Sequence, residues 1–358
     1  MTGGGALRVD LRSDTVTRPT PAMLDAMLGA RVGDDCFGED PTVRALEERT
    51  AELLGKERAL FLPSGIMANQ VALLAMGEPG TEVLVEARAH LLHYEESSVA
   101  AHGGMTLRAI STPDGRLTAD TVAGALRPAS PFHPRVSALA IENTHLDSGG
   151  RVMSAGVVAD VAEVAHAAGL RVHLDGARLW NAAAALGVEA SELTAPVDTV
   201  MTCLSKGLGA PVGSMMAGPA DVVERGWRIR RRLGGQMRQA GFLAAAGLYA
   251  LEHHRARLEE DHARARRLAE GVAYLPGIRL QAPETNVVMI DVSGTGMAPS
   301  ELVARLREHG VGMVPFGPTR LRAVLHLDVD DAGVELAISV LSGVLRGDEA
   351  GDPERPAR

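Results

Sequence analysis

Aromatic side chains and cysteine are both scarce in this chain. Phe, Trp and Tyr make up only 3% of the 358 residues, so Ala, Val and Leu must fill most of the core. The two cysteines, Cys36 and Cys203, are too few for a disulfide framework, and neither belongs to a CxxC pair of the kind that binds zinc. We therefore expect neither a disulfide-stabilised fold nor a metal site.

The chain also lacks an excess of positive charge. Its formal net charge is −9, whereas a protein that grips nucleic-acid phosphates needs a basic surface. The basic run from Arg228 to Arg232 is a local exception, which a solvated helix face or a subunit interface explains better than a nucleic-acid contact. We expect no nucleic-acid partner.

Long apolar segments are missing as well. No stretch is apolar over enough residues to span a bilayer, and the N-terminus lacks the basic segment and apolar run of a secretory signal. These absences predict a soluble cytoplasmic protein without membrane contact. What is present, 46% hydrophobic and 23% charged residues, is typical of a globular protein, and the length predicts one large domain and a smaller one.

Short apolar runs alternate with helical patterns over the first two thirds of the chain. The runs at 81–86, 136–141, 170–174 and 198–204 have the length of buried strands, and 154–168 has a helical period. A strand, a helix and a strand at this spacing form a βαβ unit. The pattern predicts an α/β fold whose mainly parallel sheet is covered on both faces.

The last third predicts a second domain. A long helix rich in Ala and Arg is expected from about 241 to 271, leading into it. We expect residues 1–250 to form an N-terminal segment and the large domain, and 251–345 a small C-terminal α+β domain. The charged tail at 346–358 is expected to be disordered. Within the small domain, strands are predicted near 286–291 and 321–327, and helices near 299–309 and 331–345.

Lys206 follows the apolar run 198–204 and enters a loop rich in Gly and Pro. A lysine at the end of a core strand is costly to bury without a partner. A Schiff base with a cofactor aldehyde would explain its position, because the ammonium group then becomes an imine nitrogen. The alternative is an ordinary surface lysine at a strand end, and for Lys206 taken alone this alternative is the stronger.

Asp175 lies at the carboxyl end of another apolar run, in VHLDGAR. Ligands of open α/β sheets bind at these ends. A carboxylate about thirty residues before Lys206 suits the pyridine nitrogen of pyridoxal phosphate (PLP), because an ionised carboxylate keeps that nitrogen protonated. The alternative is a helix N-cap with Gly176 opening the turn, and the position of Lys206 favours the cofactor role.

Ser64 and Gly65 precede an apolar helical run in FLPSGIMANQVALLAM. The start of a helix leaves backbone N–H groups free, and such groups bind anions such as a cofactor phosphate. A Ser-Gly pair alone is weak evidence, because it is also an ordinary cap. Together with Asp175 and Lys206, in this order, it predicts a PLP site.

The motifs in the chain resemble those of the low-specificity L-threonine aldolases, PLP enzymes of the aspartate-aminotransferase type. The resemblance spans nearly the whole chain in the family's order. It implies PLP-dependent transferase fold type I, with a large, mainly parallel seven-stranded-type sheet, and a homotetramer built as a dimer of dimers. The matching stretches are DLRSDTVTRPTPAM (10–23), FGEDPTVRALE (37–47), PSGIMANQ (63–70), ENTHLDSGG (142–150), HLDGARLWNAA (173–183), CLSKGLGAPVGS (203–214), LGGQMRQAG (233–241) and LRAVLHLDV (321–329).

The same resemblance implies roles for individual residues of the cofactor site. Lys206 matches the Schiff-base lysine, and Asp175 matches the partner of the pyridine nitrogen. His90 matches the histidine that stacks on the cofactor ring. Gly65 and the backbone N–H of Ile66 match the phosphate cradle.

For the substrate, the resemblance implies that Ser13, Arg178 and Arg322 hold the carboxylate, and Arg178 is expected to contact the cofactor as well. His145 matches a second histidine near the substrate hydroxyl. Arg238 is a weaker match, expected to reach the cofactor site of a neighbouring subunit.

Three positions depart from the family pattern. Ile66 stands where the family usually has Thr, so one hydroxyl contact to the phosphate would be lost. Gln236 and Leu325 stand where the family often has Gly and Thr. None of these changes affects Lys206 or Asp175, but they bear on cofactor affinity and substrate preference.

These residue types suit the cleavage of a β-hydroxy-α-amino acid, such as threonine, into glycine and an aldehyde. Arginine fixes the substrate carboxylate and with it the orientation of the bonds at Cα. A histidine moves the β-hydroxyl proton at a pH near neutral. Either His145 or His90 can be this base, directly or through water.

Other PLP reactions remain as alternatives, because the scaffold serves many chemistries. An aminotransferase would use Lys206 to move a proton between Cα and the cofactor, and a β-eliminating lyase would expel a group from Cβ. Serine hydroxymethyltransferase would need a folate site, to which no stretch can be assigned. A regulator that has lost activity would lack Lys206 or Asp175, yet both are present.

Overall fold

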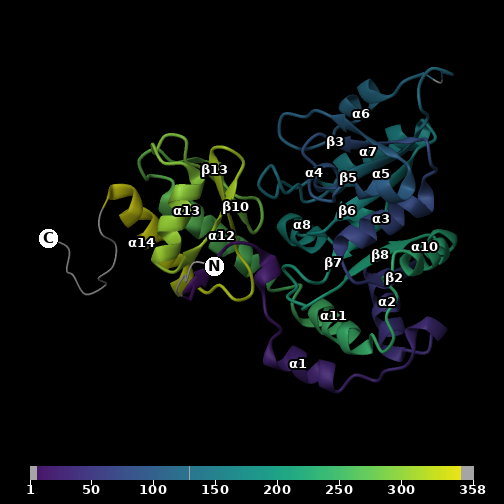
Figure 1. The fold of residues 1–358 in the computed structure, drawn as a ribbon, viewed down its shortest axis with the longest axis horizontal. Helices are drawn as coiled ribbons and strands as arrows, with labels where there is room; N and C mark the ends of the chain where they lie inside the picture. Colours follow the sequence, from purple (N-terminus) through teal and green to yellow (C-terminus); the bar gives the residue numbers. More distant parts are fainter. Residues whose placement is uncertain (1–5, 129, 348–358) are drawn as a thin grey trace. The chain divides into compact units, whose positions relative to one another are not determined.

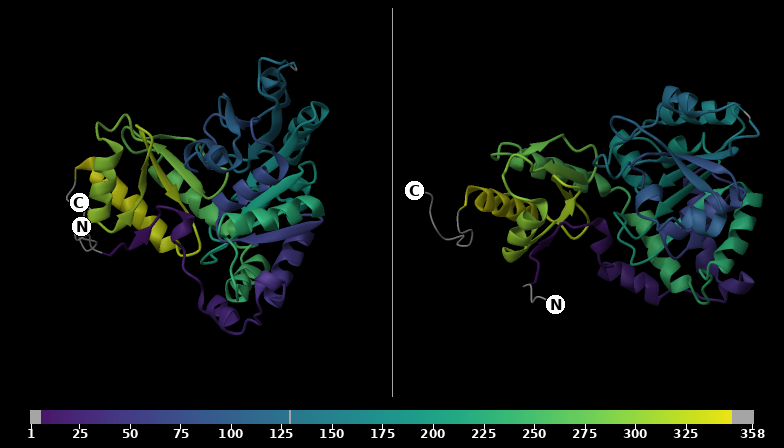
Figure 2. Two further views of the ribbon diagram at one scale, coloured as in Figure 1. Left: turned by 45° about the vertical axis from the view of Figure 1, so that its right-hand side comes forward. Right: turned by 45° about the horizontal axis from the view of Figure 1, so that its top comes forward.

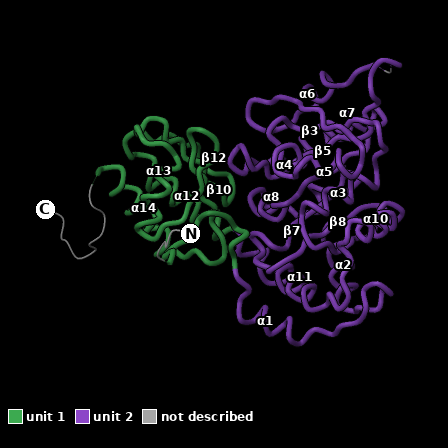
Figure 3. The backbone as a smooth tube through the Cα atoms, in the orientation of Figure 1, with its two compact units in different colours: residues 1–17, 259–358 green, residues 18–258 purple. Residues whose placement is uncertain are grey.

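The computed structural model describes residues 6–128 and 130–347. The chain forms two compact units, a large unit of residues 18–258 and a small unit of residues 1–17 and 259–358 (Figure 3). Among the described residues, no helix combines the length and the apolar character needed to cross a bilayer.

The large unit is built on a seven-stranded sheet with the order β2-β8-β7-β6-β5-β3-β4 (Figure 1). Neighbouring strands are parallel except in the two pairs that contain β8. This confirms the mainly parallel sheet. Its strands are β2 (Arg58–Leu62), β3 (Glu82–Glu86), β4 (Thr106–Ile110), β5 (Val136–Glu142), β6 (Arg171–Gly176), β7 (Thr199–Cys203) and β8 (Ser214–Gly218).

Helices cover both faces of this sheet (Figure 2). On β3, Leu84 belongs to the core cluster that contains residues of α2, α7 and α11, whereas Val83 and Val85 belong to the cluster that contains residues of α3 and α5. Since successive strand residues point to opposite faces, a sheet covered twice needs continuous apolar runs, as the sequence has. The helices are α1 (Pro21–Leu28), α2 (Pro41–Leu53), α3 (Gly65–Met76), α4 (His90–His93), α5 (Ser98–Gly103), α6 (Ala119–Ala125), α7 (Ala155–Ala167), α8 (Leu179–Leu186), α9 (Ala190–Thr194), α10 (Ala220–Arg232) and α11 (Gly241–His253), with the 3₁₀ turn η2 (Asp35–Phe37).

The small unit contains a four-stranded antiparallel sheet, β12-β13-β10-β9, and a parallel pair of β1 and β11. Its helices pack on these strands around an aliphatic core of its own. This is the predicted α+β domain. The elements are β1 (Val9–Asp10), η1 (Asp14–Val16), α12 (Leu258–Val272), β9 (Arg279–Leu280), β10 (Val287–Asp291), α13 (Pro299–Glu308), β11 (Val311–Gly312), β12 (Val314–Phe316), β13 (Arg320–Val324) and α14 (Asp331–Arg346).

The stretch predicted to be helical from about 241 to 271 is divided by the structure into two helices, α11 and α12. His254 ends the first helix, and its buried Nδ1 donates a hydrogen bond to the carbonyl of Leu208 at 2.7 Å. Arg255 donates to the carbonyl of Leu251 at 2.6 Å and lies over the ring of Trp180. These contacts with other parts of the chain override the helical pattern.

The unit boundaries differ from the expected domain limits at the N-terminus. Residues 1–17 cluster with the small unit, since Val9 and Asp10 pair with Val311 and Gly312. The expected tail begins at Arg346, which is still the last residue of α14. From residue 348 onward that tail lies outside the described residues.

The basic run on α10 is not uniformly solvated. Arg230 is 1% exposed, and its guanidinium binds the carboxylate of Asp35 at 2.8 Å and the carbonyl of Phe61 at 2.8 Å. Arg228 is exposed and pairs only with Glu224, one helical turn away. The interpretation of the run as a solvated face or subunit interface therefore fails for Arg230, which stabilises the large unit internally.

Candidate active site

Polar residues gather where the parallel strands of the large sheet end. Glu86 is the last residue of β3 and Glu142 the last of β5, while Asp175 lies near the end of β6. Lys206 follows the end of β7 by three residues. Parallel strands end at one edge of a sheet, so β3, β5, β6 and β7 bring these groups to a common edge, where open α/β sheets bind ligands.

Asp175 is buried and held by neutral donors. Its Oδ2 accepts a hydrogen bond from the Asn69 amide at 2.9 Å, and its Oδ1 accepts one from the backbone N–H of Ala177 at 3.1 Å. Within the described ranges, no Lys or Arg side chain forms an ion pair with it. The N-cap alternative is not supported, because the next helix, α8, has Arg178 as its N-cap. Asp175 is a buried carboxylate with capacity for a cationic partner.

His90 is the first residue of α4 and is only partly buried, with 26% of its side chain exposed. Its Nδ1 lies 2.9 Å from a carboxylate oxygen of Glu95, and its backbone N–H donates to Glu142 at 2.7 Å. Burial lowers the pKa of His90, but the hydrogen bond with Glu95 and the charge of Asp175 outweigh burial, so the pKa is raised. At Nε2 the ring has no hydrogen-bond partner within the described part of the chain.

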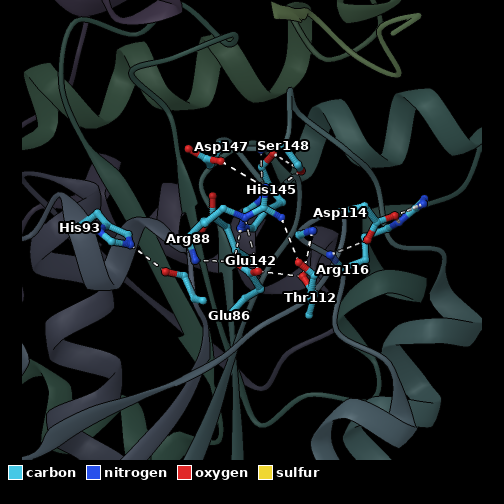
Figure 4. Close-up of polar contacts among 12 residues, drawn as sticks. Glu86, Arg88, His93, Thr112, Asp114, Arg116, Glu142, His145, Asp147 and Ser148 are labelled. Atoms are coloured by element: carbon cyan, nitrogen blue, oxygen red, sulfur yellow. Dashed lines mark hydrogen bonds and ion pairs between the residues drawn. The ribbon is translucent and has the colours of Figure 1, made fainter. Parts of the chain in front are cut away.

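His145 is surrounded by polar side chains of the protein (Figure 4). Its Nε2 is 3.1 Å from the carboxylate of Glu86, its Nδ1 is 3.0 Å from the hydroxyl of Ser148, and the residue is fully buried. The neighbouring loop leaves no room, since a Cβ on Gly115 would lie 2.3 Å from Nδ1. Nδ1 therefore has its hydrogen-bond partners in Ser148, whereas Nε2 lies against the Glu86 carboxylate without a well-aligned hydrogen bond.

The charge of His145 is balanced by Glu86. Burial lowers the pKa of His145, but the hydrogen bond with Glu86 and the charge of Glu142 reverse the shift and raise the pKa. Burial would raise the pKa of Glu86, yet hydrogen bonds from His145, the backbone of Arg88 and Thr112 lower it to about 2. Each shift favours the charged form of its group, so the two side chains stabilise each other's charge.

Lys206 is one of only two lysines in the chain, since the other cations counted with it are arginines. The second, Lys56, donates to the carbonyl of Val197 at 2.6 Å, away from this sheet edge. The loop of Lys206 is held from both sides: Gly209 N–H donates to the Lys206 carbonyl at 2.8 Å, and His254 binds the carbonyl of Leu208. Lys206 is the one lysine positioned for chemistry at this edge.

The start of α3 lies against the end of β7. Ser64 caps the helix by accepting a hydrogen bond from Met67 N–H at 3.2 Å. A Cβ on Gly65 would lie 2.9 Å from the Cys203 sulfur, so only glycine allows this approach. Ile66 is 39% exposed and is therefore not a core residue. The free N–H groups of this first turn can bind an anion.

The two predicted arginines of the large unit differ in environment. Arg178 follows β6 directly and is 5% exposed. Arg238 lies between α10 and α11 with 66% of its side chain exposed, and it pairs with Asp34 at 3.4 Å. Burial beside Asp175 suits Arg178 to a ligand site within this chain, whereas Arg238 faces outward.

Ser13 and Arg322 belong to the small unit. Arg322 lies on β13, donates to the carbonyl of Arg12 at 3.2 Å and stacks over Phe316. Arg12 directly precedes Ser13, whose hydroxyl caps η1 by accepting from the N–H of Thr15 at 3.2 Å. The small unit therefore brings Ser13 and Arg322 near each other.

The sequence analysis missed five residues of this edge. They are Asn69, Glu86, Glu95, Glu142 and His173, all buried. Glu86 and Glu142 carry the same signal as Asp175, a carboxylate at the end of an apolar strand. Asn69 and Glu95 have a weaker signal: a polar side chain within an apolar helix, and a carboxylate just after His90.

Three side chains at this sheet edge are of types that bind metal ions. Ligand atoms of His90, Glu95 and Asp175 lie within 4.8 Å of one another. The hydrogen bond between His90 and Glu95, and the Asn69 amide that binds both carboxylates, account for this closeness. The arrangement is therefore explained by hydrogen bonding alone.

Comparison with known proteins decides the family. The model of the beta-eliminating lyases matches residues 10–295. Low-specificity L-threonine aldolase 1 of Arabidopsis thaliana is 41% identical over 338 residues, covering 92% of this chain and 94% of that protein. The chain belongs to the low-specificity L-threonine aldolase family.

Other members and solved structures agree with this threonine aldolase assignment. Low specificity L-threonine aldolase of Escherichia coli (strain K12) is 42% identical over 322 residues, covering 90% of this chain and 94% of that protein. The crystal structure of Leishmania major threonine aldolase has a TM-score of 0.80 at 19% identity and covers 94% of this chain and 99% of that chain. The predicted PLP-dependent transferase fold type I is confirmed.

Proposed function

We propose that this threonine aldolase family member is a PLP-dependent aldehyde-lyase. Its substrates are L-threonine, L-allo-threonine and related β-hydroxy-α-amino acids, which it cleaves to glycine and an aldehyde. The observation that carries the proposal is that Asp175 lies near the end of β6 and Lys206 just after the end of the neighbouring strand β7. Family membership supports the same reaction.

The residues at this edge fit PLP. Asp175 is buried without a Lys or Arg partner in the described ranges, and a protonated ring nitrogen would supply the missing cation. The α3 start offers free N–H groups to a phosphate, and Gly65 keeps the space open. Beside Gly65 lies the buried hydroxyl of Ser214, which has no hydrogen-bond partner among the described residues. A phosphate would provide acceptors for such donors.

Each residue at the edge then has a definite task. PLP, when bound, supplies the electron sink that stabilises the negative charge left at Cα when the Cα–Cβ bond breaks. Lys206 offers the amine that holds the cofactor aldehyde, and Asp175 holds the proton on the ring nitrogen. Gly65 and the Ile66 N–H bind the phosphate.

The proton of the substrate β-hydroxyl needs a base, and the two histidines differ in suitability. His145 is fully buried, with Glu86 at Nε2 and Ser148 at Nδ1, so neither ring nitrogen is accessible to a substrate hydroxyl. His90 has Glu95 at Nδ1 only, and its raised pKa makes it a stronger base than a free imidazole. We assign the proton transfer to Nε2 of His90, and to His145 a buried contact that stabilises the charge of Glu86.

The remaining roles follow the family resemblance. Arg178, Ser13 and Arg322 bind the substrate carboxylate, where bidentate arginine contacts fix the bonds at Cα. Arg178 also contacts the cofactor. The protein is a cytoplasmic homotetramer, in which the exposed Arg238 reaches the site of a neighbouring subunit. Light scattering of the purified protein measures the tetramer directly.

The decisive experiment is incubation of the purified, PLP-loaded protein with L-threonine. We expect equimolar glycine and acetaldehyde without a keto-acid acceptor and without ammonia. Transfer of the amino group to a keto acid would instead establish the aminotransferase, and ammonia release the β-eliminating lyase. Borohydride reduction followed by peptide mapping should label Lys206, and the variant Lys56→Arg should label equally well. Label that disappears in Lys56→Arg would refute the assignment.

A further inference from the structure

Asn69 connects two carboxylates of the site. It lies on α3 and is 1% exposed. Its Nδ2 donates to Glu95 Oε1 at 2.9 Å and to Asp175 Oδ2 at 2.9 Å. One side-chain amide therefore touches both the carboxylate beside His90 and the carboxylate at the end of β6.

The orientation of this amide is fixed by chemistry. Ionised carboxylates only accept hydrogen bonds, so the nitrogen of Asn69 must face them. Its Oδ1 then faces His173 Nε2, 2.9 Å away, which must carry a proton to donate. Burial lowers the pKa of His173 to about 4, so this ring is neutral and has a proton to donate at one nitrogen only. Both N–H groups of Asn69 are used on carboxylates.

The two carboxylates need this bridge because they repel each other. Their oxygen atoms lie within 4.8 Å in a buried region. Burial and the charge of Asp175 raise the pKa of Glu95, whereas the hydrogen bonds from His90 and Asn69 lower it. Without the amide, Glu95 would bind a proton more readily and would no longer support a positive His90.

We propose that Asn69 is a positioning residue of the reaction, whose amide aims Asp175 at the cofactor nitrogen and Glu95 at Nδ1 of His90. The proposal rests on the proposed function for the meaning of these two targets. Through Glu95, the bridge leaves Nε2 as the nitrogen of His90 that is available to substrate. Through Asp175, it fixes the oxygen that the ring nitrogen meets.

The pKa of His90 depends on whether the Asn69 amide binds Glu95, so it can be used to test this contact. The charged groups that face its ring are Glu95 and Asp175, which raise its pKa, and Lys206, which lowers it; Glu142 binds its backbone N–H, and Tyr94 is its neighbouring ring. In Asn69→Leu, Glu95 loses a donor and becomes protonated at higher pH. The anionic support of His90 weakens, so the pKa of His90 must fall.

The experiment compares the parent with Asn69→Leu as full-length chains stripped of cofactor. NMR titration should show the His90 pKa lowered by about one pH unit. A PLP titration should show binding weakened by about tenfold or more, the effect of losing a hydrogen bond to a charged group. Ala72→Gly, at a fully buried position of the same helix, is the matched control: it should lower the melting temperature and change neither quantity.

Two further variants separate a bridge from general damage. In a Glu95→Gln background, Asn69→Leu should no longer move the His90 pKa, and in an Asp175→Asn background it should no longer move PLP affinity. If Asn69→Leu does not fold, Asn69→Ser replaces it. One hydroxyl can donate to only one of the two carboxylates, so this variant must lower either the His90 pKa or the PLP affinity.

Unchanged His90 pKa and PLP affinity in these Asn69 variants would overturn the proposal, as would equal changes in Ala72→Gly. Failure of the proposed function has another signature. It appears as a parent protein that releases no glycine from threonine, whatever the titrations of Asn69→Leu show.

Discussion

His90 and His145 lie near the same edge of one sheet, yet their surroundings differ. His145 is fully buried, with Glu86 at one ring nitrogen and Ser148 at the other. His90 is about a quarter exposed and has one partner, Glu95. The difference shows that the His145 ring is enclosed by the protein at both nitrogens, whereas the His90 ring keeps Nε2 for chemistry.

Charge balance distinguishes the two regions as well. Glu86 lies against two cationic side chains, His145 at 3.1 Å and Arg88 at 3.7 Å, and hydrogen bonds lower its pKa to about 2 despite burial. Around His90, two carboxylates, Glu95 and Asp175, share one amide. That region has anionic capacity left for a cationic ligand group.

The largest effect is expected from Lys206→Ala, which removes the only lysine at the sheet edge where His90 lies. Threonine cleavage should fall below detection, because no other lysine lies at this sheet edge. The His145 pair should be untouched, so urea unfolding of the cofactor-free protein should match the parent. Turnover that survives with PLP present would show that another group carries the cofactor.

The comparison itself is tested by His90→Ala and His145→Ala. Loss of a positioned base typically lowers kcat by about 10²–10⁴-fold, and we expect this for His90→Ala with little change in unfolding free energy. His145→Ala should mainly destabilise the fold, because it takes the imidazole away from the buried Glu86 carboxylate, which keeps the longer 3.7 Å contact with Arg88. Steady-state kinetics and urea titrations measure both. If kcat instead fell in His145→Ala and the unfolding free energy fell in His90→Ala, His145 would be the base.

Glu86→Gln tests the contact between Glu86 and His145 through its effect on the free energy of unfolding. Removing one partner of a buried pair costs about 3–5 kcal/mol. The lowered pKa of Glu86 contributes stability that is complete above 4.5 and is lost as the pH falls toward about 2. The raised pKa of His145 contributes stability that is complete below 6.5 and is lost as the pH rises through the folded value.

The two contributions overlap between pH 4.5 and 6.5, so the variant and parent should differ most in that window. Urea unfolding across the pH range measures the difference. A difference in stability that does not vary with pH would argue against an ion pair.

Glu95→Gln tests the surroundings of His90 through the pH dependence of kcat/KM. A base must be deprotonated to act, so kcat/KM should fall below the pKa of His90, which lies above 6.5 in the parent. The variant removes the Glu95 charge and lowers that pKa. The acid limb of the profile should move to lower pH, by about one pH unit. An unmoved limb would separate His90 from the titrating base.

The smallest effect is expected from Ile66→Thr. Ile66 lies in the first turn of α3 and is 39% exposed, so a hydroxyl there can reach a phosphate without disturbing the core. A hydrogen bond to a charged group limits the gain in PLP affinity to about tenfold when water already fills part of the contact. PLP titration of the stripped protein measures it. Equal affinities would place the phosphate elsewhere or show the contact already filled.

The strand-end residues were accessible from sequence because their signal is local. Asp175 and Lys206 each follow an apolar run, and Gly65 opens an apolar helix. Asn69 was not recognised, because its partners Glu95 and Asp175 lie 26 and 106 residues away along the chain. The helix break at His254 was missed for the same reason, since its cause is the distant carbonyl of Leu208.

The fold followed from periodicity in the same way. Buried runs such as 136–141 gave strands within one or two residues of their observed ends. The pairing of the N-terminal segment with the small unit could not be predicted, because a two-residue strand such as β1 has no periodicity to detect. Pairings between distant short segments depend on the folded sheet and not on local pattern.

The scarcity of lysine has a consequence for a protein that releases an aldehyde. Aldehydes react with neutral primary amines and form adducts that accumulate with turnover. Arginine, which supplies nearly all the positive charge here, stays protonated and is a poor nucleophile. Of the two lysines, Lys56 is engaged with the carbonyl of Val197. The chain thus carries its positive charge in a form that resists modification by its own product.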